Sequence, residues 1–145
     1  MNEPIKIQEC FHVSAEKIWQ AITDKEQMKQ WYFDIPDFEL KVDSTFNFYE
    51  PGGAKKYHHR CTIKEILPNR KLQHTLTHPS HSKGESMLTW EIFPIGRFTL
   101  VTLTHLGVEN FSDGGSDFSR ENYEGGWNEL IGKLLKAFLV KQQSS

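Results

Sequence analysis

The first residues of the chain alternate between apolar and other side chains. Ile5, Ile7 and Phe11 occupy odd positions, and polar or small residues occupy the even positions between them. Successive side chains of a strand point to opposite faces of a sheet, so a period of two predicts a strand from Ile5 to Phe11.

A helical pattern replaces this alternation from Ser14 onward. Ser14 is a typical N-cap residue, and an apolar stripe that includes Ile18 and Ile22 follows it. A second short helix is expected to begin after Asp24, another good N-cap residue, and to end near Trp31. The pattern therefore predicts two short helices directly after the first strand.

The middle of the chain contains short runs rich in Thr, Val and aromatic residues, which are typical of antiparallel strands. Pro68-Asn69-Arg70 and Pro94-Ile95-Gly96 interrupt these runs and predict the turns of two hairpins. In the second hairpin, alternate residues from Leu88 to Ile92 and from Val101 to His105 should face the same side of the sheet. The predicted strands span residues 38–42, 46–48, 56–67, 71–77, 85–93 and 98–106.

The end of the chain has helical periodicity again, from about Ser119. The expected apolar face consists of Trp127, Leu130, Ile131, Leu134, Leu135 and Phe138. Lys133 and Lys136 should lie on other faces and stay exposed. Gly125 and Gly126 are unusual inside a helix, and they predict either a bend or a close approach to a neighbouring element.

The order of elements is strand, two short helices, about six further segments of strand, and a long helix. An antiparallel sheet buries one face, and the only large apolar partner available for that face is the terminal helix. We therefore expect an α+β fold with six or seven strands wrapped on the C-terminal helix, in which residues 1–145 form a single domain.

Composition and charge exclude several functional classes. Seventeen basic and nineteen acidic residues are interspersed without a basic stripe, which argues against nucleic-acid binding. No segment resembles a signal peptide or a membrane span. Cys10 and Cys61 lie in predicted strands without a CxxC spacing, as suits free thiols in a reducing compartment, so a cytoplasmic location is expected.

Five segments together carry a resemblance to a known family. They are FHVSAEKIW (11–19), Thr23-Asp24-Lys25-Glu26 leading to Trp31, IKEILPNRKL (63–72), TLVTLTH (99–105), and Gly126-Trp127 followed by Leu130 and Leu134. In this order and spacing the chain resembles the START/Bet v 1-like (SRPBCC) superfamily of helix-grip domains. Within it, the chain is most similar to the bacterial family related to the C-terminal domain of the heat-shock protein 90 ATPase activator. Ser14, Ser44-Thr45 and Cys61 depart from residues common in that family, so the resemblance does not imply a ligand.

The resemblance implies a curved sheet gripping the helix, and the register suggests which side chains face a cavity between them. The polar members matter most, because a buried polar group needs a partner. Glu9, His74 and His105 could bind one another or the polar end of a ligand; alternatively, Glu9 and His105 reach water at strand ends. The predicted cavity residues are Glu9, Phe11, Trp31, Phe33, Phe46, Phe48, Cys61, His74, Trp90, His105 and Trp127.

No motif predicts a cofactor, a metal site or a catalytic nucleophile. His58 and His59 are adjacent on a strand, so they should point to opposite faces and cannot share a metal. His78 and His81 flank a predicted turn, where they could chelate only weakly, because closed zinc sites need three or four ligands in fixed geometry. We expect no metal site, no cofactor and no catalytic set.

Three functional hypotheses remain. The first is an intracellular module whose cavity binds a hydrophobic or amphipathic small molecule, with Trp31 and Phe33 either bordering its mouth or plugging one end. The second is a co-chaperone-like or regulatory module that binds a protein partner. The third is a cyclase- or hydrolase-like enzyme with Glu9 and His105 as the acid–base pair, which fold analogy alone supports.

Overall fold

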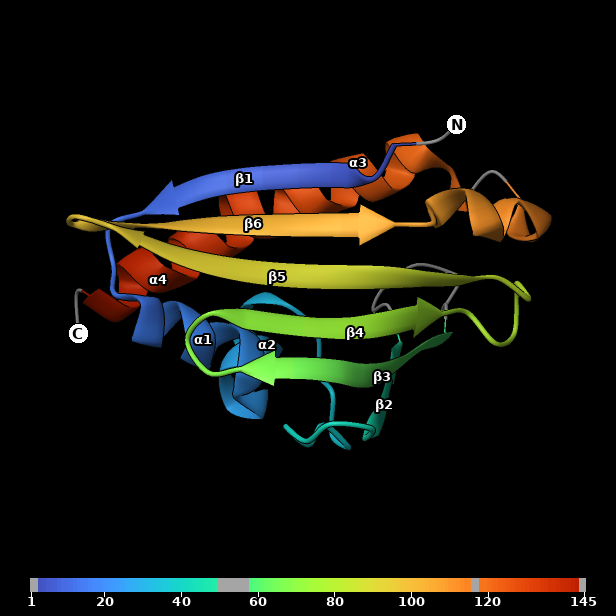
Figure 1. Cartoon of the computed structure of the whole chain (residues 1–145), viewed down its shortest axis with the longest axis horizontal. Coiled ribbons are helices and arrows are strands. Elements are labelled where there is room, and N and C mark those ends of the chain that lie inside the picture. Colours follow the sequence, from blue (N-terminus) through green and yellow to red (C-terminus); the bar gives the residue numbers. More distant parts are fainter. Residues whose placement is uncertain (1–2, 50–57, 116–117, 144–145) are drawn as a thin grey trace.

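The computed structural model describes residues 3–49, 58–115 and 118–143. It shows six antiparallel strands in one curved, open sheet with the order β1-β6-β5-β4-β3-β2 (Figure 1). The predicted α+β helix-grip architecture is confirmed. The strands are β1 (Ile5–Phe11), β2 (Thr45–Tyr49), β3 (His58–Leu67), β4 (Lys71–Thr77), β5 (Glu85–Ile95) and β6 (Phe98–Leu106).

The helices cover one face of this sheet. In Figure 1 the C-terminal helix passes behind β1, β6 and β5, while α1 and α2 lie behind the other half. Ser14, Asp24 and Ser119 cap α1, α2 and α3 through their side-chain oxygens, as helix N-termini require. The helices are α1 (Ala15–Thr23), α2 (Lys25–Trp31), the 3-10 helix η1 (Val108–Gly114), α3 (Arg120–Glu129), the π-helical segment η3 (Leu130–Leu135) and α4 (Lys136–Gln143).

The β5–β6 hairpin has the predicted inward side chains, but its turn is shorter than predicted, because Pro94 and Ile95 belong to β5 and pair with Thr99 and Phe98. Leu88 lies opposite His105, and Trp90 lies opposite Leu103. All four side chains are buried on the helix-facing side of the sheet. Gly96 has φ of 59° at the turn, a conformation that glycine adopts without steric cost. The alternation of inward and outward side chains along the sequence therefore predicts the buried face of these two strands correctly.

The strand predicted at residues 38–42 is wrong, because this segment is a loop closed by a turn. Ser44 Oγ lies 2.7 Å from the carbonyl oxygens of both Glu39 and Lys41. Such local hydroxyl bonds compete with strand pairing. Leu40 and Val42 are consequently exposed, although their spacing matched a strand. Of the predicted strand 56–67, residues 56 and 57 lie outside the described residues.

The C-terminal helix changes from α-helical to π-helical geometry at η3. Its apolar face therefore differs from the predicted one. Hydrogen bonds in a π-helix join residues five apart, so each turn holds more residues than in an α-helix. Side chains three and seven positions on therefore rotate away from the face that they would share in an α-helix. Trp127, Ile131 and Leu135 are buried in this way, whereas Leu134 is 43% exposed. Leu130, also expected on the buried face, is only half-buried.

The polar face of the same helix agrees with the prediction. Lys133 and Lys136 are exposed. A Cβ added at Gly125 or Gly126 would meet open space, so these glycines do not permit a close approach to another element. The alternative, a bend at the glycines, stays a prediction.

Candidate functional site

Two aromatic residues directly after α2 join rings from three other elements. Tyr32 lies 4.5 Å from Phe33 between ring centroids, 6.0 Å from Phe48 in β2 and 6.2 Å from Trp90 in β5. It also stacks on Trp127 of α3 at 6.3 Å. Tyr32 and Phe33 are half-buried, whereas the other three rings are buried. The cluster therefore extends from the core to the surface where α2 ends.

Trp31 and Phe33, predicted together at a cavity mouth, occupy different environments. Trp31 is buried, and its indole N–H donates a 2.8 Å hydrogen bond to the carbonyl of Ala21. Phe33 is half-buried and stacks on Phe48 at 4.7 Å. The Trp31 hydrogen bond thus holds α2 against α1. Phe33, unlike Trp31, lies where the aromatic cluster reaches the surface.

A small enclosed cavity lies under α1 and α2, away from the C-terminal helix. Its volume is about 10 Å³, which is about the least that holds one water molecule. Trp31, Phe46, His74 and Trp90 are the predicted cavity residues that line it. The full lining is Ile22, Met28, Trp31, Tyr32, Ile35, Phe38, Phe46, Leu72, His74 and Trp90.

Phe11 and Cys61, two further predicted cavity residues, are buried members of the hydrophobic core. Burial also raises the pKa of the Cys61 thiol. A buried thiol held protonated is a poor nucleophile. The Cys61 side chain therefore contributes to the packing of the core.

The proposed association of Glu9 with the two histidines is wrong. Glu9 lies opposite Val101, and His105 lies opposite Ile5, at the other end of the same strand pair. The Glu9 side chain is 33% exposed and lies 3.6 Å from Lys136 Nζ. Strand geometry thus separates the residues, and the Glu9–His105 acid–base pair of the enzyme hypothesis is not assembled.

His105 and His74 find partners elsewhere. His105 lies between the indole N–H of Trp127, at 3.1 Å, and the hydroxyl of Ser86, at 2.8 Å. His74 Nδ1 lies 2.9 Å from the carbonyl of Thr75 and donates to it, since a carbonyl can only accept. His105 is fully buried, so the expectation that it reaches water is also wrong.

Two further histidines, His59 and His78, meet beside the aromatic cluster. His78 Nδ1 lies 3.3 Å from the carbonyl of His58, and its Nε2 lies 2.6 Å from the hydroxyl of Tyr123. The neutral ring therefore donates from Nδ1 and accepts the Tyr123 proton at Nε2. The His59 ring stacks on Phe48 at 4.6 Å and meets His78 edge-on at 4.7 Å.

The buried histidines are held neutral by their surroundings. Burial is the main cause that lowers the pKa of His59 and His105 to about 3, and that of His74 and His78 to about 4. Burial also raises the pKa of the Tyr32 hydroxyl. At neutral pH this part of the core offers hydrogen-bonding groups without charge.

The sequence interpretation considered His59 and His78 only as metal ligands and did not consider Tyr123. His58 and His59 do point to opposite faces, with His58 Nε2 2.8 Å from Asn47 Oδ1. Within residues 3–49, 58–115 and 118–143, no group of three His, Cys, Asp or Glu side chains has metal-binding geometry. The available signal was the inward register: His59 pairs with Phe48, whose inward orientation was predicted.

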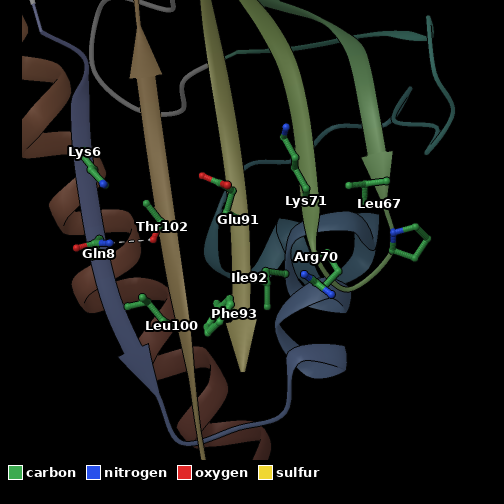
Figure 2. A pocket seen from close by; sticks show the side chains of 11 residues that line it. Lys6, Gln8, Leu67, Arg70, Lys71, Glu91, Ile92, Phe93, Leu100 and Thr102 are labelled. Carbon is green, nitrogen blue, oxygen red and sulfur yellow. Dashed lines mark hydrogen bonds between the residues drawn. The ribbon is translucent and has the colours of Figure 1, made fainter. Parts of the chain in front are cut away.

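The opposite face of the sheet carries an open hollow. Figure 2 shows its side chains projecting from β1, β6, β5 and β4, with the C-terminal helix on the far side. Phe93 and Leu100 provide apolar surface, and Gln8 donates a 3.2 Å hydrogen bond to Thr102. Lys6, Arg70, Lys71 and Glu91 give the hollow mixed charge.

Solved structures share this fold throughout the chain. Mll3558 from Rhizobium loti is 20% identical, with a TM-score of 0.79 over 93% of this chain and 95% of that one. CalU16 from Micromonospora echinospora is 17% identical, with a TM-score of 0.72 over 97% and 78%. PFC0360w, an HSP90 activator from Plasmodium falciparum, is 18% identical, with a TM-score of 0.70 over 98% and 97%. At these identities the likeness establishes the fold alone.

None of the helices within the described ranges combines the length and apolar character needed to cross a membrane.

No curated protein matches the sequence. The family model described as "Activator of Hsp90 ATPase homolog 1-like protein" matches residues 12–139, which is most of the chain. The chain therefore belongs to the family of proteins like the Hsp90 ATPase activator homolog 1.

Proposed function

We propose that the protein binds an apolar or amphipathic small molecule against the aromatic cluster at the end of α2, between the sheet and the C-terminal helix. The observation that carries the proposal is the position of Tyr32 and Phe33. Both residues are half-buried, and their rings contact buried rings of β2, β5 and α3. Ligand sites are concave, largely aromatic surfaces with few polar groups, and this cluster has that composition.

Phe33 is the side chain that would give way to such a ligand. Its ring covers Phe48 at 4.7 Å and lies 6.0 Å from His59. The cavity under α2 has room for about one water molecule, so a larger ligand would fit there only if a side chain moved. Rotation of Phe33 would expose the faces of Phe48 and His59 to an incoming ring without changing the backbone.

A fluorescence titration with the neutral probe N-phenyl-1-naphthylamine tests this proposal. Phe33→Ala should bind the probe more tightly than wild type, because it leaves a ring-sized space beside Phe48. Phe33→Trp should bind more weakly, because the larger ring fills the entrance. Phe93→Ala, which removes an exposed ring from the opposite face, is the matched control and should match wild type.

Two results would contradict the proposal. One is a probe that binds neither wild type nor Phe33→Ala. The other is a probe whose affinity responds to Phe93→Ala and not to either Phe33 variant, which would place the bound ring on the outer face of the sheet.

A second candidate function is docking of a protein partner on that outer face. Phe93, Ile95 and Phe98 are 58%, 48% and 50% exposed around the β5–β6 turn. Exposed apolar side chains gathered in this way often mark interaction surfaces. The family description and the Plasmodium neighbour both name activation of heat-shock protein 90, so this ATPase is the partner to test.

The ATP hydrolysis rate of the host's own heat-shock protein 90, measured with and without this protein, tests the second candidate. Stimulation that is lost in Phe93→Ser/Phe98→Ser and kept in Phe33→Ala would support docking through the outer face. No change in rate with wild-type protein would count against it.

A further inference from the structure

The half-buried His59 differs from the buried His78 and His105 in its hydrogen bonding. Its Nε2 is inaccessible to solvent and has no hydrogen-bond partner among the described residues. His78 and His105, by contrast, have partners at both ring nitrogens. A buried polar atom without a partner destabilises the folded state, so its presence needs a physical reason.

Packing does not supply that reason. The His59 ring lies parallel to Phe48, with an interplanar angle of 7° and a centroid distance of 4.6 Å. It also contacts Phe33 and the edge of His78. A phenylalanine in place of His59 would keep these ring contacts without burying an unpaired nitrogen. The imidazole therefore places a hydrogen-bonding atom in a position that an apolar ring would otherwise suit.

We propose that His59 Nε2 is the hydrogen-bonding group of the ligand site, and that the ligand is an apolar ring system carrying one neutral hydroxyl or carbonyl group. This inference rests on the proposed function, because it assumes a ligand at the rings of Phe33 and Phe48. The ligand's apolar part would replace Phe33 on Phe48, and its polar group would reach the adjacent His59.

The described surroundings of His59 favour a neutral ligand group over a charged one. Among the residues that the structure describes, the ionisable groups that influence its protonation are His78 and His58, and neither is a carboxylate, a lysine or an arginine. A ligand ammonium would find no opposite charge among these described neighbours. A ligand carboxylate would need a protonated His59, which burial opposes by lowering the pKa of His59 to about 3. A neutral donor or a neutral acceptor can bond to Nε2 without placing a charge in the site. Both are possible because neutral imidazole has two tautomers, one with and one without a proton on Nε2.

Three naphthalene compounds of similar size separate these possibilities: 2-naphthol, 2-methylnaphthalene and 2-naphthoate. Dissociation constants are measured at pH 7 for wild type and His59→Phe. The affinity of 2-naphthol relative to 2-methylnaphthalene should fall about fivefold in His59→Phe, the usual effect of losing one neutral hydrogen bond. His59→Gln, which keeps a donor and an acceptor, should retain most of the preference. His12→Phe is the control, because His12 lies at the exposed Phe98 and should leave the ratio unchanged.

Urea unfolding of the free proteins provides a second readout. His59→Phe should unfold at the same or a higher urea concentration than wild type, because it removes a buried unpaired nitrogen and keeps the ring. A lower midpoint together with an unchanged ligand ratio would assign His59 a structural role and overturn the inference.

The remaining outcomes distinguish the two proposals. Binding of both neutral compounds with the same ratio in wild type and His59→Phe overturns the role of His59 and leaves the proposed function standing. Tightest binding of 2-naphthoate overturns the neutral ligand class. Binding of none of the three compounds to wild type overturns the small-molecule function and the inference with it.

Discussion

The indole N–H of Trp127 in α3 donates a 3.1 Å hydrogen bond to Nδ1 of His105 in β6. Because Nδ1 accepts, the neutral imidazole carries its proton on Nε2 and donates it to Ser86 Oγ at 2.8 Å. Ser86 then donates to the carbonyl of Leu76 at 3.2 Å. One chain of hydrogen bonds thus connects the C-terminal helix to β6, β5 and β4 inside the core.

Trp127→Phe should destabilise the protein by about 1–3 kcal/mol, because it keeps an aromatic ring but leaves His105 Nδ1 buried without a donor. Trp127→Ala should cost about 3–5 kcal/mol, since it also removes the ring from the core. Urea unfolding monitored by circular dichroism measures both. In a His105→Phe background, Trp127→Phe should cost clearly less, and equal costs in the two backgrounds would show that the bond adds no stability.

The π turn in the C-terminal helix makes a separate prediction about two neighbouring apolar residues. Ile131→Ala should cost about 2–5 kcal/mol, because Ile131 is fully buried. Leu134→Ala should change the free energy of unfolding by about 0.5 kcal/mol or less, because Leu134 is largely exposed. Similar losses from Leu134→Ala and Ile131→Ala would indicate a regular α-helix with both side chains on the buried face, as the sequence predicts.

The sequence predicted the sheet well because its signals are local. Alternation identified the buried face of β5 and β6, and Pro68 marked the turn after β3. Pro94, expected in a turn, lies instead inside β5 opposite Thr99. Residues 38–42 misled the prediction because the side chain of Ser44, beyond the run, closes the turn. Leu134 misled it because a π turn shifts side chains without leaving a recognisable pattern in the sequence.

The candidate site was harder to predict, because hydrogen-bond partners in it are far apart in the chain. Trp127 and His105 were both expected inside, yet their bond to each other depends on how α3 lies across the sheet. The His78–Tyr123 bond likewise joins a turn to a helix. Glu9 followed the inward register, but the register alone does not say how near a strand position lies to the surface.

The two cysteines should differ sharply in reactivity. Cys10 is exposed on β1, whereas Cys61 is fully buried and burial raises its pKa. Ellman's reagent should therefore modify one thiol per chain quickly in the native protein and the second only after denaturation. Cys10→Ser should abolish the fast reaction. A fast second thiol in the native protein would mean that the core around Cys61 opens readily.

Acid should destabilise the protein well before its carboxylates are protonated. The pKa values of His59 and His105 are lowered to about 3, and those of His74 and His78 to about 4, so the folded state keeps all four neutral near pH 5. In the unfolded chain their pKa is about 6.5. The unfolded state therefore binds more protons below that pH, and stability present above pH 6.5 is lost as pH falls toward 4.

Each histidine should lower the free energy of unfolding by up to about 2 kcal/mol between pH 7 and pH 5. The four together then approach the whole stability of a typical domain. Urea midpoints at pH 7, 6 and 5 measure the loss. His59→Phe should reduce the pH dependence by about a quarter, because it removes one of four similar groups. His12→Phe, at an exposed histidine, should leave it unchanged. A wild-type midpoint that stays constant from pH 7 to pH 5 would show that these histidines remain accessible to protons in the folded protein.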